Sequence, residues 1–295
     1  MGWKIIEIDK PCLLKTFLNN LLIIKSEKIV IPIQDIDTLL IDNTQISISI
    51  NLITELTEAG VNIIICNNKH LPTSILTGIN VKKQNYEVFH EQLNWSNDYK
   101  KQCWKTILKY KLKNQIDLMK RYELNLNNWE KIINMDIDPY SNLESQLANL
   151  FFHQMYGHEF NRDQKNQVNY LMDYGYVVIT SMVVRSIIKK GLNQHISFFH
   201  GSKYSSFPLA YDIVEPFRII IDYFVKEMYN NEMIYKLDMN IESELKSCLL
   251  DYVANYRVKM DNNYQYLNNA IDIFIDWIIK QELESHTMEF IFDVK

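Results

Sequence analysis

The hydrophobic pattern of the chain changes character near residue 80. Before that point the apolar residues form short, β-branched runs that polar turns separate, which predicts strands, and their spacing favours hairpins over βαβ units. The predicted strands are Trp3–Ile8, Leu13–Leu18, Leu21–Ile24, Lys28–Ile33, Thr38–Ile41 and Val61–Cys66. One stretch differs, because apolar residues recur at helical spacing from Ile46 until Gly60, a good residue just past a helix end.

Beyond Ile79 helical periods continue to the C-terminus. The sequence therefore predicts an α+β protein with a small N-terminal β domain over residues 1–80, containing one helix, and a larger all-α domain over residues 81–295. The link between them is expected near Gly78–Lys83. Exposed strand edges in the β domain would need a cover, and pairing of two copies is one way to supply it.

Three predicted helices organise the second domain. Asn97–Lys120 forms a long helix, Ser141–Met155 a shorter one, and Asn166–Lys190 is so apolar that it must be the central buried helix. A further helix starts after Ser206 or Phe207, with Pro208 tolerated in its first turn. Pro216 then removes one helical hydrogen bond and predicts a kink at the preceding residue.

Composition narrows the class of protein. The four cysteines lie far apart, which fits reduced thiols better than a zinc site or a disulfide framework. The apolar runs fall short of a membrane span and the N-terminus lacks a targeting signal, so we expect a soluble, cytoplasmic protein without membrane contact. The motifs of serine hydrolases, phosphate-loop enzymes, dinucleotide-binding folds and HExxH metalloproteases are missing.

The net charge of −5 hides an uneven distribution. Residues 82–121 carry ten basic and four acidic side chains, so a local positive surface exists on an acidic chain. Within this region Lys101, Lys105 and Lys109 follow i, i+4 spacing along one side of the long helix. The plain interpretation is a solvated lysine face, and the alternative is contact with the phosphate backbone of a nucleic acid.

Candidate chemistry gathers around residues 200–218. Asp212 and Glu215 are three residues apart on one helix face, and His200 lies just before that helix. Far upstream, Glu144 lies on the flank of an apolar stripe, where a carboxylate needs a cation, a donor or water. Taken alone, these residues also fit a kinked core helix, a satisfied histidine and a salt-bridged glutamate. Together, carboxylates and an imidazole suit Mn²⁺ and admit Mg²⁺, as phosphodiester chemistry requires.

Four motifs in a fixed order carry a family resemblance. They are Glu144-Ser145-Gln146 leading into Phe151-Phe152, the run Asn169 to Tyr176, His200, and Tyr211-Asp212-Ile213-Val214-Glu215-Pro216-Phe217-Arg218. With these motifs the chain resembles the CRISPR-associated adaptation integrases, the larger subunit of the two-protein pair that inserts new spacers. The resemblance covers nearly the whole chain and is greatest to the type II branch.

The resemblance implies a metal-dependent DNA endonuclease and integrase with Glu144, His200 and Glu215 as catalytic metal ligands and Asp212 as an auxiliary acidic group. The implied cofactor is Mg²⁺ or Mn²⁺. Asn169 and Tyr174 match positions near the DNA path, and Arg218, with the lysine face, becomes a DNA-contact candidate. Asp173 stands where many relatives have asparagine.

The implied partners are double-stranded DNA, as spacer precursor and as repeat, a second copy of the chain, and the small adaptation subunit, one dimer of which bridges two dimers of the larger one. Further type II adaptation proteins complete the expected set. Each 3′-hydroxyl of the precursor attacks a phosphodiester at the repeat boundary, which serves antiviral defence. Two alternatives stay open at this point: a stand-alone, structure-selective DNA repair nuclease and a non-catalytic DNA-binding scaffold.

Overall fold

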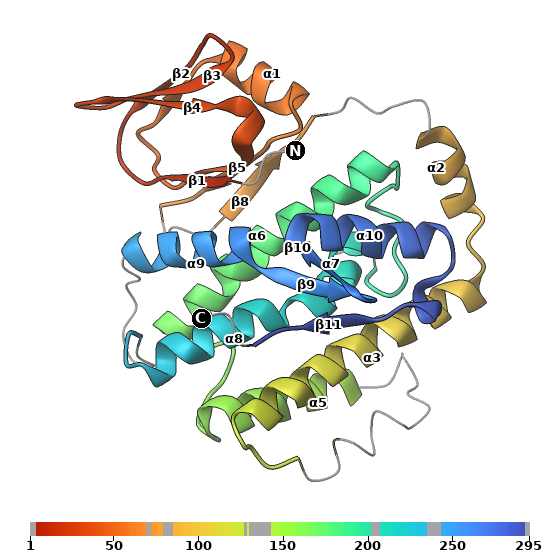
Figure 1. Ribbon diagram of the computed structural model, residues 1–295. Helices are drawn as coiled ribbons and strands as arrows, with labels where there is room; N and C mark the ends of the chain where they lie inside the picture. The colour runs from red at the N-terminus through yellow and green to blue at the C-terminus, as the bar shows by residue number, and fades with distance from the viewer. Residues whose placement is uncertain are drawn as a thin grey trace.

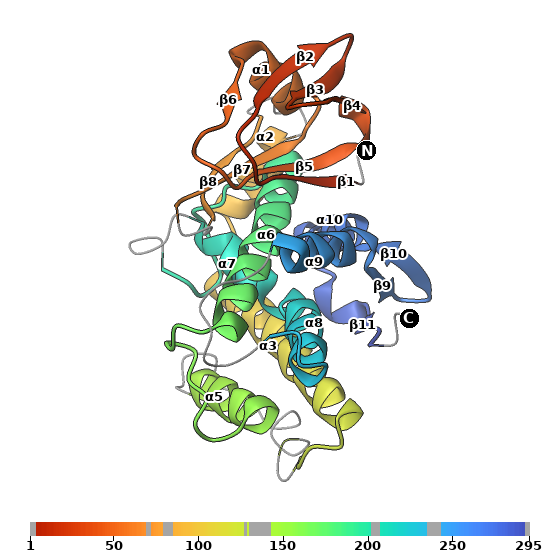
Figure 2. The ribbon, with the colours of Figure 1, turned by 90° about the vertical axis from the view of Figure 1, so that its left-hand side faces the viewer.

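The computed structural model describes residues 4–68, 72–78, 85–126, 129, 143–201, 207–234 and 243–292. It has an N-terminal region of two sheets and a larger, mostly helical C-terminal region below them in Figure 1. Seen from the side in Figure 2, helix α6 (Gln167–Lys190) runs down from the sheets through the middle of the helical region. The predicted α+β class is therefore confirmed, whereas the expected link falls largely outside the described residues.

The two N-terminal sheets differ in strand direction. The first has the order β1-β5-β7-β8, from β1 (Lys4–Ile8), β5 (Ile36–Ile41), β7 (Asn62–Cys66) and β8 (Pro72–Leu76). The second has the order β4-β3-β2-β6, from β4 (Lys28–Pro32), β3 (Asn20–Ile24), β2 (Leu13–Phe17) and β6 (Ser47–Ile48). Hairpins join β2, β3 and β4 as the spacing predicted. The preference for hairpins is wrong for β1, β5 and β7, which pair in parallel.

Strand β5 explains why part of this region is parallel. All six of its residues are buried, as is typical of a strand covered on both faces. Leu39 and Ile41 belong to the N-terminal core, while Leu40 belongs to the core of the helical region. The first sheet thus lies between the two cores.

The one helix predicted in the N-terminal region is α1 (Ile50–Glu58), which Ser49 caps by accepting a hydrogen bond from the Leu52 amide.

The helical region is built around α6. Asn166 caps its N-terminus, and it ends at Gly191, whose φ of 86° is a left-handed conformation that suits glycine. By length and hydropathy α6 could span a membrane, but 78% of its most apolar window is buried within the fold, as expected of a core helix. The surrounding helices are α2 (Asn85–Leu93), α3 (Asn97–Arg121), α5 (Leu143–Tyr156), α7 (Pro208–Val214), α8 (Ile219–Asn230), α9 (Ser243–Asn255) and α10 (Leu267–Ile279).

A small antiparallel sheet corrects the prediction of an all-α second domain. Its order is β10-β9-β11, from β10 (Asn263–Tyr266), β9 (Arg257–Met260) and β11 (Met288–Phe290). These strands have only three or four residues, too few for an alternating pattern to stand out between amphipathic helices. Short 3₁₀ turns complete the described elements: η1 (Ile33–Asp35), η2 (Glu215–Phe217) and η3 (Leu283–Ser285).

Buried polar contacts join the first sheet to the helical region. Asp37 at the start of β5 pairs with Arg185 on α6, and Asp42 just after β5 pairs with Lys246 on α9 at 2.8 Å. The Asn62 amide also donates to the carbonyl of Ser181 at 3.0 Å. Because buried charges are costly unless paired, these contacts specify how the sheet sits on the helices.

Candidate active site

The kink predicted at Glu215 is present. The carboxylates of Asp212 and Glu215, before and at this kink, have different neighbours. Helix α7 ends at Val214, and Glu215–Phe217 forms the 3₁₀ turn η2 before α8 begins at Ile219. The carbonyl of Pro216, within this 3₁₀ turn, accepts a hydrogen bond from the Asn114 side chain on α3 at 3.0 Å. Asp212 is fully buried, and Glu215 is 4% exposed.

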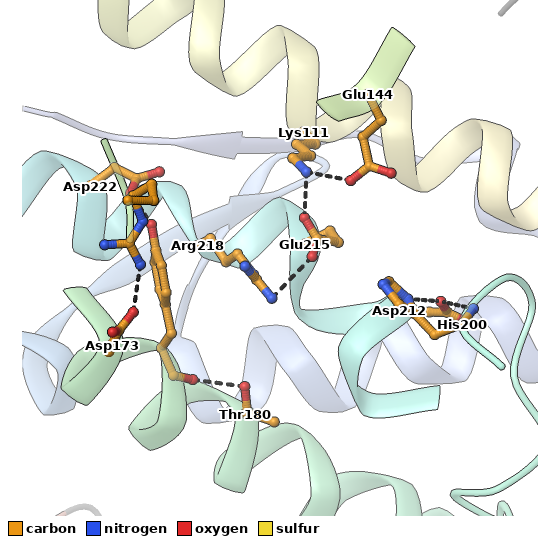
Figure 3. A network of polar contacts seen from close by, with 11 residues as sticks. Lys111, Glu144, Asp173, Thr180, His200, Asp212, Glu215, Arg218 and Asp222 are labelled. Atoms are coloured by element: carbon orange, nitrogen blue, oxygen red, sulfur yellow. Dashed lines mark hydrogen bonds and ion pairs between the residues drawn. The ribbon is translucent and has the colours of Figure 1, made fainter. Parts of the chain in front are cut away.

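Asp212 holds the histidine and the loop before it. Its carboxylate accepts the backbone N–H groups of Phe198 at 2.6 Å and of Phe199 and His200 at 3.1 Å. It also lies 2.6 Å from the Nδ1 atom of His200, as Figure 3 shows. The ring of Trp104 on α3 packs edge-on against the imidazole. This carboxylate and histidine arrangement fixes the ring and leaves Nε2 available to a ligand, as at many metal sites.

The electrostatic surroundings of His200 join it to the other carboxylates. Burial alone would lower the pKa of the imidazole, but the hydrogen bond and charge of Asp212, then the charges of Glu215 and Glu144, raise it. His200 therefore lies within the field of all three acidic groups. Among the described residues, however, neither a hydrogen bond nor an ion pair joins it to Glu144 or Glu215.

A lysine bridges the other two candidate ligands. The Nζ atom of Lys111 on α3 lies 2.7 Å from Oε1 of Glu144 on α5 and 2.6 Å from Oε2 of Glu215. Figure 3 shows the ammonium between the two carboxylates. Burial alone would raise the pKa of Glu215, but Arg218 and Lys111 outweigh it and lower the pKa to about 2. The carboxylate is thus ionised over the whole physiological range.

A cleft lined by charged and apolar side chains continues from this bridge. It has an empty volume of about 450 Å³ and is lined by Lys111, Gln115, Ala148, Phe152, Arg162, Tyr176, Glu215, Arg218, Ile219 and Asp222. The Arg218 guanidinium lies 3.1 Å from Glu215 and over the ring of Tyr176. Asp222 accepts a hydrogen bond from the Tyr176 hydroxyl, and burial raises the pKa of its carboxyl to about 6. The cleft therefore combines three cations with carboxylates beside the candidate ligands.

The structure brings the predicted ligands near one another in two pairs. Glu144 and Glu215 meet at Lys111, and His200 meets Asp212. Within the part of the chain that is described, no three His, Cys, Asp or Glu side chains lie close enough to hold a metal ion. The donor chemistry nevertheless fits Mg²⁺ or Mn²⁺, because these ions take carboxylate oxygens and imidazole nitrogens as ligands, and the buried Oε2 of Glu215 already faces a cation, Lys111.

The lysine face lies on another side of α3. Lys101 and Lys109 are exposed and Lys105 is half-buried. Lys109 is two residues from Lys111, and two residues turn a helix by about 200°. The lysine face therefore points away from the carboxylates, and its contact with DNA stays a prediction.

Asn169 and Tyr174 lie inside the protein. Asn169 is 3% exposed, and its amide donates to the carbonyls of Asn161 and Gln164 at 2.8 Å. Tyr174 is 1% exposed and donates to Glu7 in the first sheet at 3.2 Å. This burial gives both residues a structural role and does not support a direct contact of either side chain with DNA.

Sequence reasoning missed Lys111, the cation at the centre of the site. A signal was present, because Leu108, Lys111, Leu112 and Gln115 follow the i, i+3, i+4 spacing of a buried stripe. A lysine on such a stripe needs a carboxylate partner. Its two partners are 33 and 104 residues away along the chain, so the pattern could not identify them.

Comparisons with known proteins agree with this fold. A family model described as CRISPR associated protein Cas1 matches residues 9–159 and 160–259. The chain belongs to the Cas1 family. A CRISPR-associated endonuclease Cas1 from Neisseria meningitidis serogroup C is 26% identical over 277 residues, which cover 92% of this chain and 90% of that protein. A Cas1 from Francisella tularensis subsp. novicida is 22% identical over 90% of this chain and 88% of its own length.

Solved structures share the fold of this Cas1 at low sequence identity. A Cas1 protein from Thermotoga maritima gives a TM-score of 0.77 at 12% identity, covering 95% of this chain and 97% of its own. A casposase bound to integration product gives a TM-score of 0.76 at 16% identity, covering 99% of this chain and 96% of its own. A chain of a Cas6-RT-Cas1–Cas2 complex gives a TM-score of 0.73. The match covers 100% of this chain and 36% of that longer chain.

Proposed function

We propose that this Cas1 is a metal-dependent DNA endonuclease and integrase that inserts spacer DNA into a CRISPR repeat array. The observation that carries the proposal is the convergence of Glu144 on α5 and Glu215 on the turn η2 on one cationic group, with His200 within the field of both carboxylates. Membership of the Cas1 family and the likeness to a casposase bound to integration product support the same reaction class.

Each residue of the site has a distinct task in this proposal. Glu144, Glu215 and the Nε2 atom of His200 would hold Mg²⁺ or Mn²⁺. A bound divalent cation supplies charge stabilisation at the reacting phosphate and activation of the attacking hydroxyl. Asp212 keeps the imidazole in the tautomer that leaves Nε2 free. Arg218, which is one-third exposed, is placed to bind a phosphate oxygen next to Glu215.

The 3′-hydroxyl of an incoming strand would attack a phosphodiester at the repeat boundary. One phosphodiester then replaces another, so the bond energy is conserved and no nucleotide hydrolysis is needed. The task of the protein is to position the two DNA strands and to stabilise the charge that develops on the phosphate.

The proposed assembly is a homodimer that binds double-stranded DNA and a small adaptation subunit in the cytoplasm, with two dimers bridged by a dimer of the small subunit. The similarity to a Cas6-RT-Cas1–Cas2 complex supports the partner. The N-terminal region supports the dimer, because β4 is last in the order of its sheet and apolar side chains are exposed on β4, at the end of β2 and in the turn between β2 and β3. These side chains are Phe17, Leu18, Ile29 and Val30, each at least 46% exposed.

A strand-joining assay tests the function. The purified chain is mixed with a duplex bearing free 3′-hydroxyls and a repeat-containing duplex, with Mn²⁺, and with or without the small subunit. We expect joined product when Mn²⁺ is present and no joined product when a chelator removes it. Glu144→Gln and His200→Ala should lower joining by roughly 10³-fold without unfolding the protein.

Matched controls and alternative outcomes make the assay decisive. Glu159→Gln and His195→Ala change exposed residues of the same types and should leave joining unchanged. Wild-type joining by either site variant would refute the assignment. Biological activity that survives chelation would indicate a scaffold, and full cleavage of branched DNA without the small subunit would indicate a repair nuclease.

A further inference from the structure

We propose that Lys111 is a displaceable internal cation that competes with the divalent metal for Glu144 and Glu215 and moves into the adjoining cleft when the metal binds. This inference rests on the proposed function, because it assumes that the two carboxylates are metal ligands. It adds a residue that sets the metal affinity. Lys111 would be a positioning residue for the metal site.

The ammonium of Lys111 lies between two carboxylates, as a bound cation would. Its ammonium contacts one oxygen of each carboxylate at 2.7 and 2.6 Å. The side chain is 13% exposed, and the opposing carboxylates keep its pKa above the ordinary value despite burial. The ammonium therefore carries a full positive charge and offsets the repulsion between Glu144 and Glu215.

A divalent cation would compete with this ammonium for the same two oxygens. Mg²⁺ binds carboxylate oxygens at about 2.1 Å, so at these oxygens it would lie within roughly 5 Å of the Nζ atom if the lysine stayed in place. Two like charges at that distance in a partly buried site repel strongly. This repulsion favours displacement of the ammonium from Glu144 and Glu215 when the metal binds.

The cleft offers the ammonium a second position. Gln115 lies one helical turn from Lys111 on the same face of α3, and its buried Oε1 atom has no hydrogen-bond partner among the residues that the structure describes. Asp222 lines the same cleft and lies close enough for the charge of Lys111 to lower the pKa of its carboxyl. A lysine stem is flexible, so the change of partner requires new side-chain rotamers and no movement of α3.

Mn²⁺ binding gives a test that does not depend on activity. The affinity is measured by the electron paramagnetic resonance signal of free Mn²⁺ in the full-length protein without DNA. Lys111→Met keeps the length of the side chain and removes its charge, so we expect Mn²⁺ to bind about 10-fold more tightly than to the wild type. Lys113→Met, an exposed lysine on the same helix, should leave the affinity unchanged.

Gln115→Met tests the second position separately. It should weaken Mn²⁺ binding by roughly threefold when Lys111 is present, and have no effect in the Lys111→Met background. An unchanged or weaker affinity in a folded Lys111→Met protein would overturn the proposal. Should that variant fail to fold, as measured by circular dichroism, an unchanged affinity of Gln115→Met alone would overturn it.

The outcome also separates this inference from the proposed function. If the wild type binds Mn²⁺ and Glu144→Gln abolishes that binding, the metal site stands and only the lysine variants decide the present inference. If the wild type does not bind Mn²⁺, both proposals fail together.

Discussion

Glu215 and Asp212 are both buried acidic residues of one short segment, and their partners give them different tasks. Arg218 and Lys111 surround Glu215, whereas backbone N–H groups and the imidazole surround Asp212. The spacing of the two residues and the resemblance to a family identified both from sequence. Their partners could not be predicted, because the chain must fold before α3 and the loop before α7 reach them.

Replacing Asp212 by asparagine tests its task as a holder of His200. Three backbone N–H groups would lose a charged acceptor, and the new amide would direct donors at other donors. We expect the free energy of unfolding to fall by about 2–4 kcal/mol and joining to fall by about 10- to 100-fold. Urea denaturation and the joining assay measure these effects. Asp163→Asn, at an exposed position, is the control, and equal stability of the two variants would contradict this task.

At the scale of elements, long amphipathic or apolar helices were predictable and strand pairing was not. The predicted bounds of α3 and α6 agree with the structure to within one residue, because more than 20 residues of each carry the pattern. The parallel pairing of β1, β5 and β7 depends on which core covers each face of β5, and no local pattern records that. The strands of the C-terminal sheet are simply too short to read.

Gly175 sets the distance between α6 and α8, the helix that follows the 3₁₀ turn η2. A Cβ atom at this position would meet the side chain of Ile221 at 2.7 Å. Gly175→Ala should therefore lower the free energy of unfolding by about 1–3 kcal/mol, measured by urea denaturation. At Gly201 a Cβ atom would meet no atom of the described residues within 4 Å, so Gly201→Ala should leave stability unchanged. Equal stability of the two variants would show that the helices pack differently.

For the whole molecule, the contact between the first sheet and the helical region contains a titratable group. Burial, together with the charge of Asp42, raises the pKa of Glu7 to about 7. Lys246 on α9 and the hydrogen bond that Tyr174 on α6 donates to Glu7 both act in the opposite direction, by lowering its pKa. The sequence predicted the N-terminal and C-terminal regions, but it could not predict that Glu7, Tyr174 and Lys246 come together between them.

Stability should therefore fall as pH rises through this range. Glu7 has a higher pKa in the folded state than its ordinary value of 4.5, so its protonated form favours folding and this contribution is lost between about pH 4.5 and 7. At pH 8, Glu7→Gln should raise the free energy of unfolding by about 1–2 kcal/mol, less than the full shift because the group is only partly buried. Exposed Glu58→Gln is the control. An identical pH profile for Glu7→Gln and the wild type would contradict this assignment.

The account depends most on whether Glu144, His200 and Glu215 bind one metal ion. Anomalous X-ray diffraction from crystals grown with Mn²⁺ measures this directly. We predict a single strong peak at about 2.1–2.3 Å from an oxygen of each glutamate and from the Nε2 atom of His200, with the Lys111 ammonium moved away. A well-ordered site without such a peak, with Lys111 still between the two carboxylates, would contradict the account.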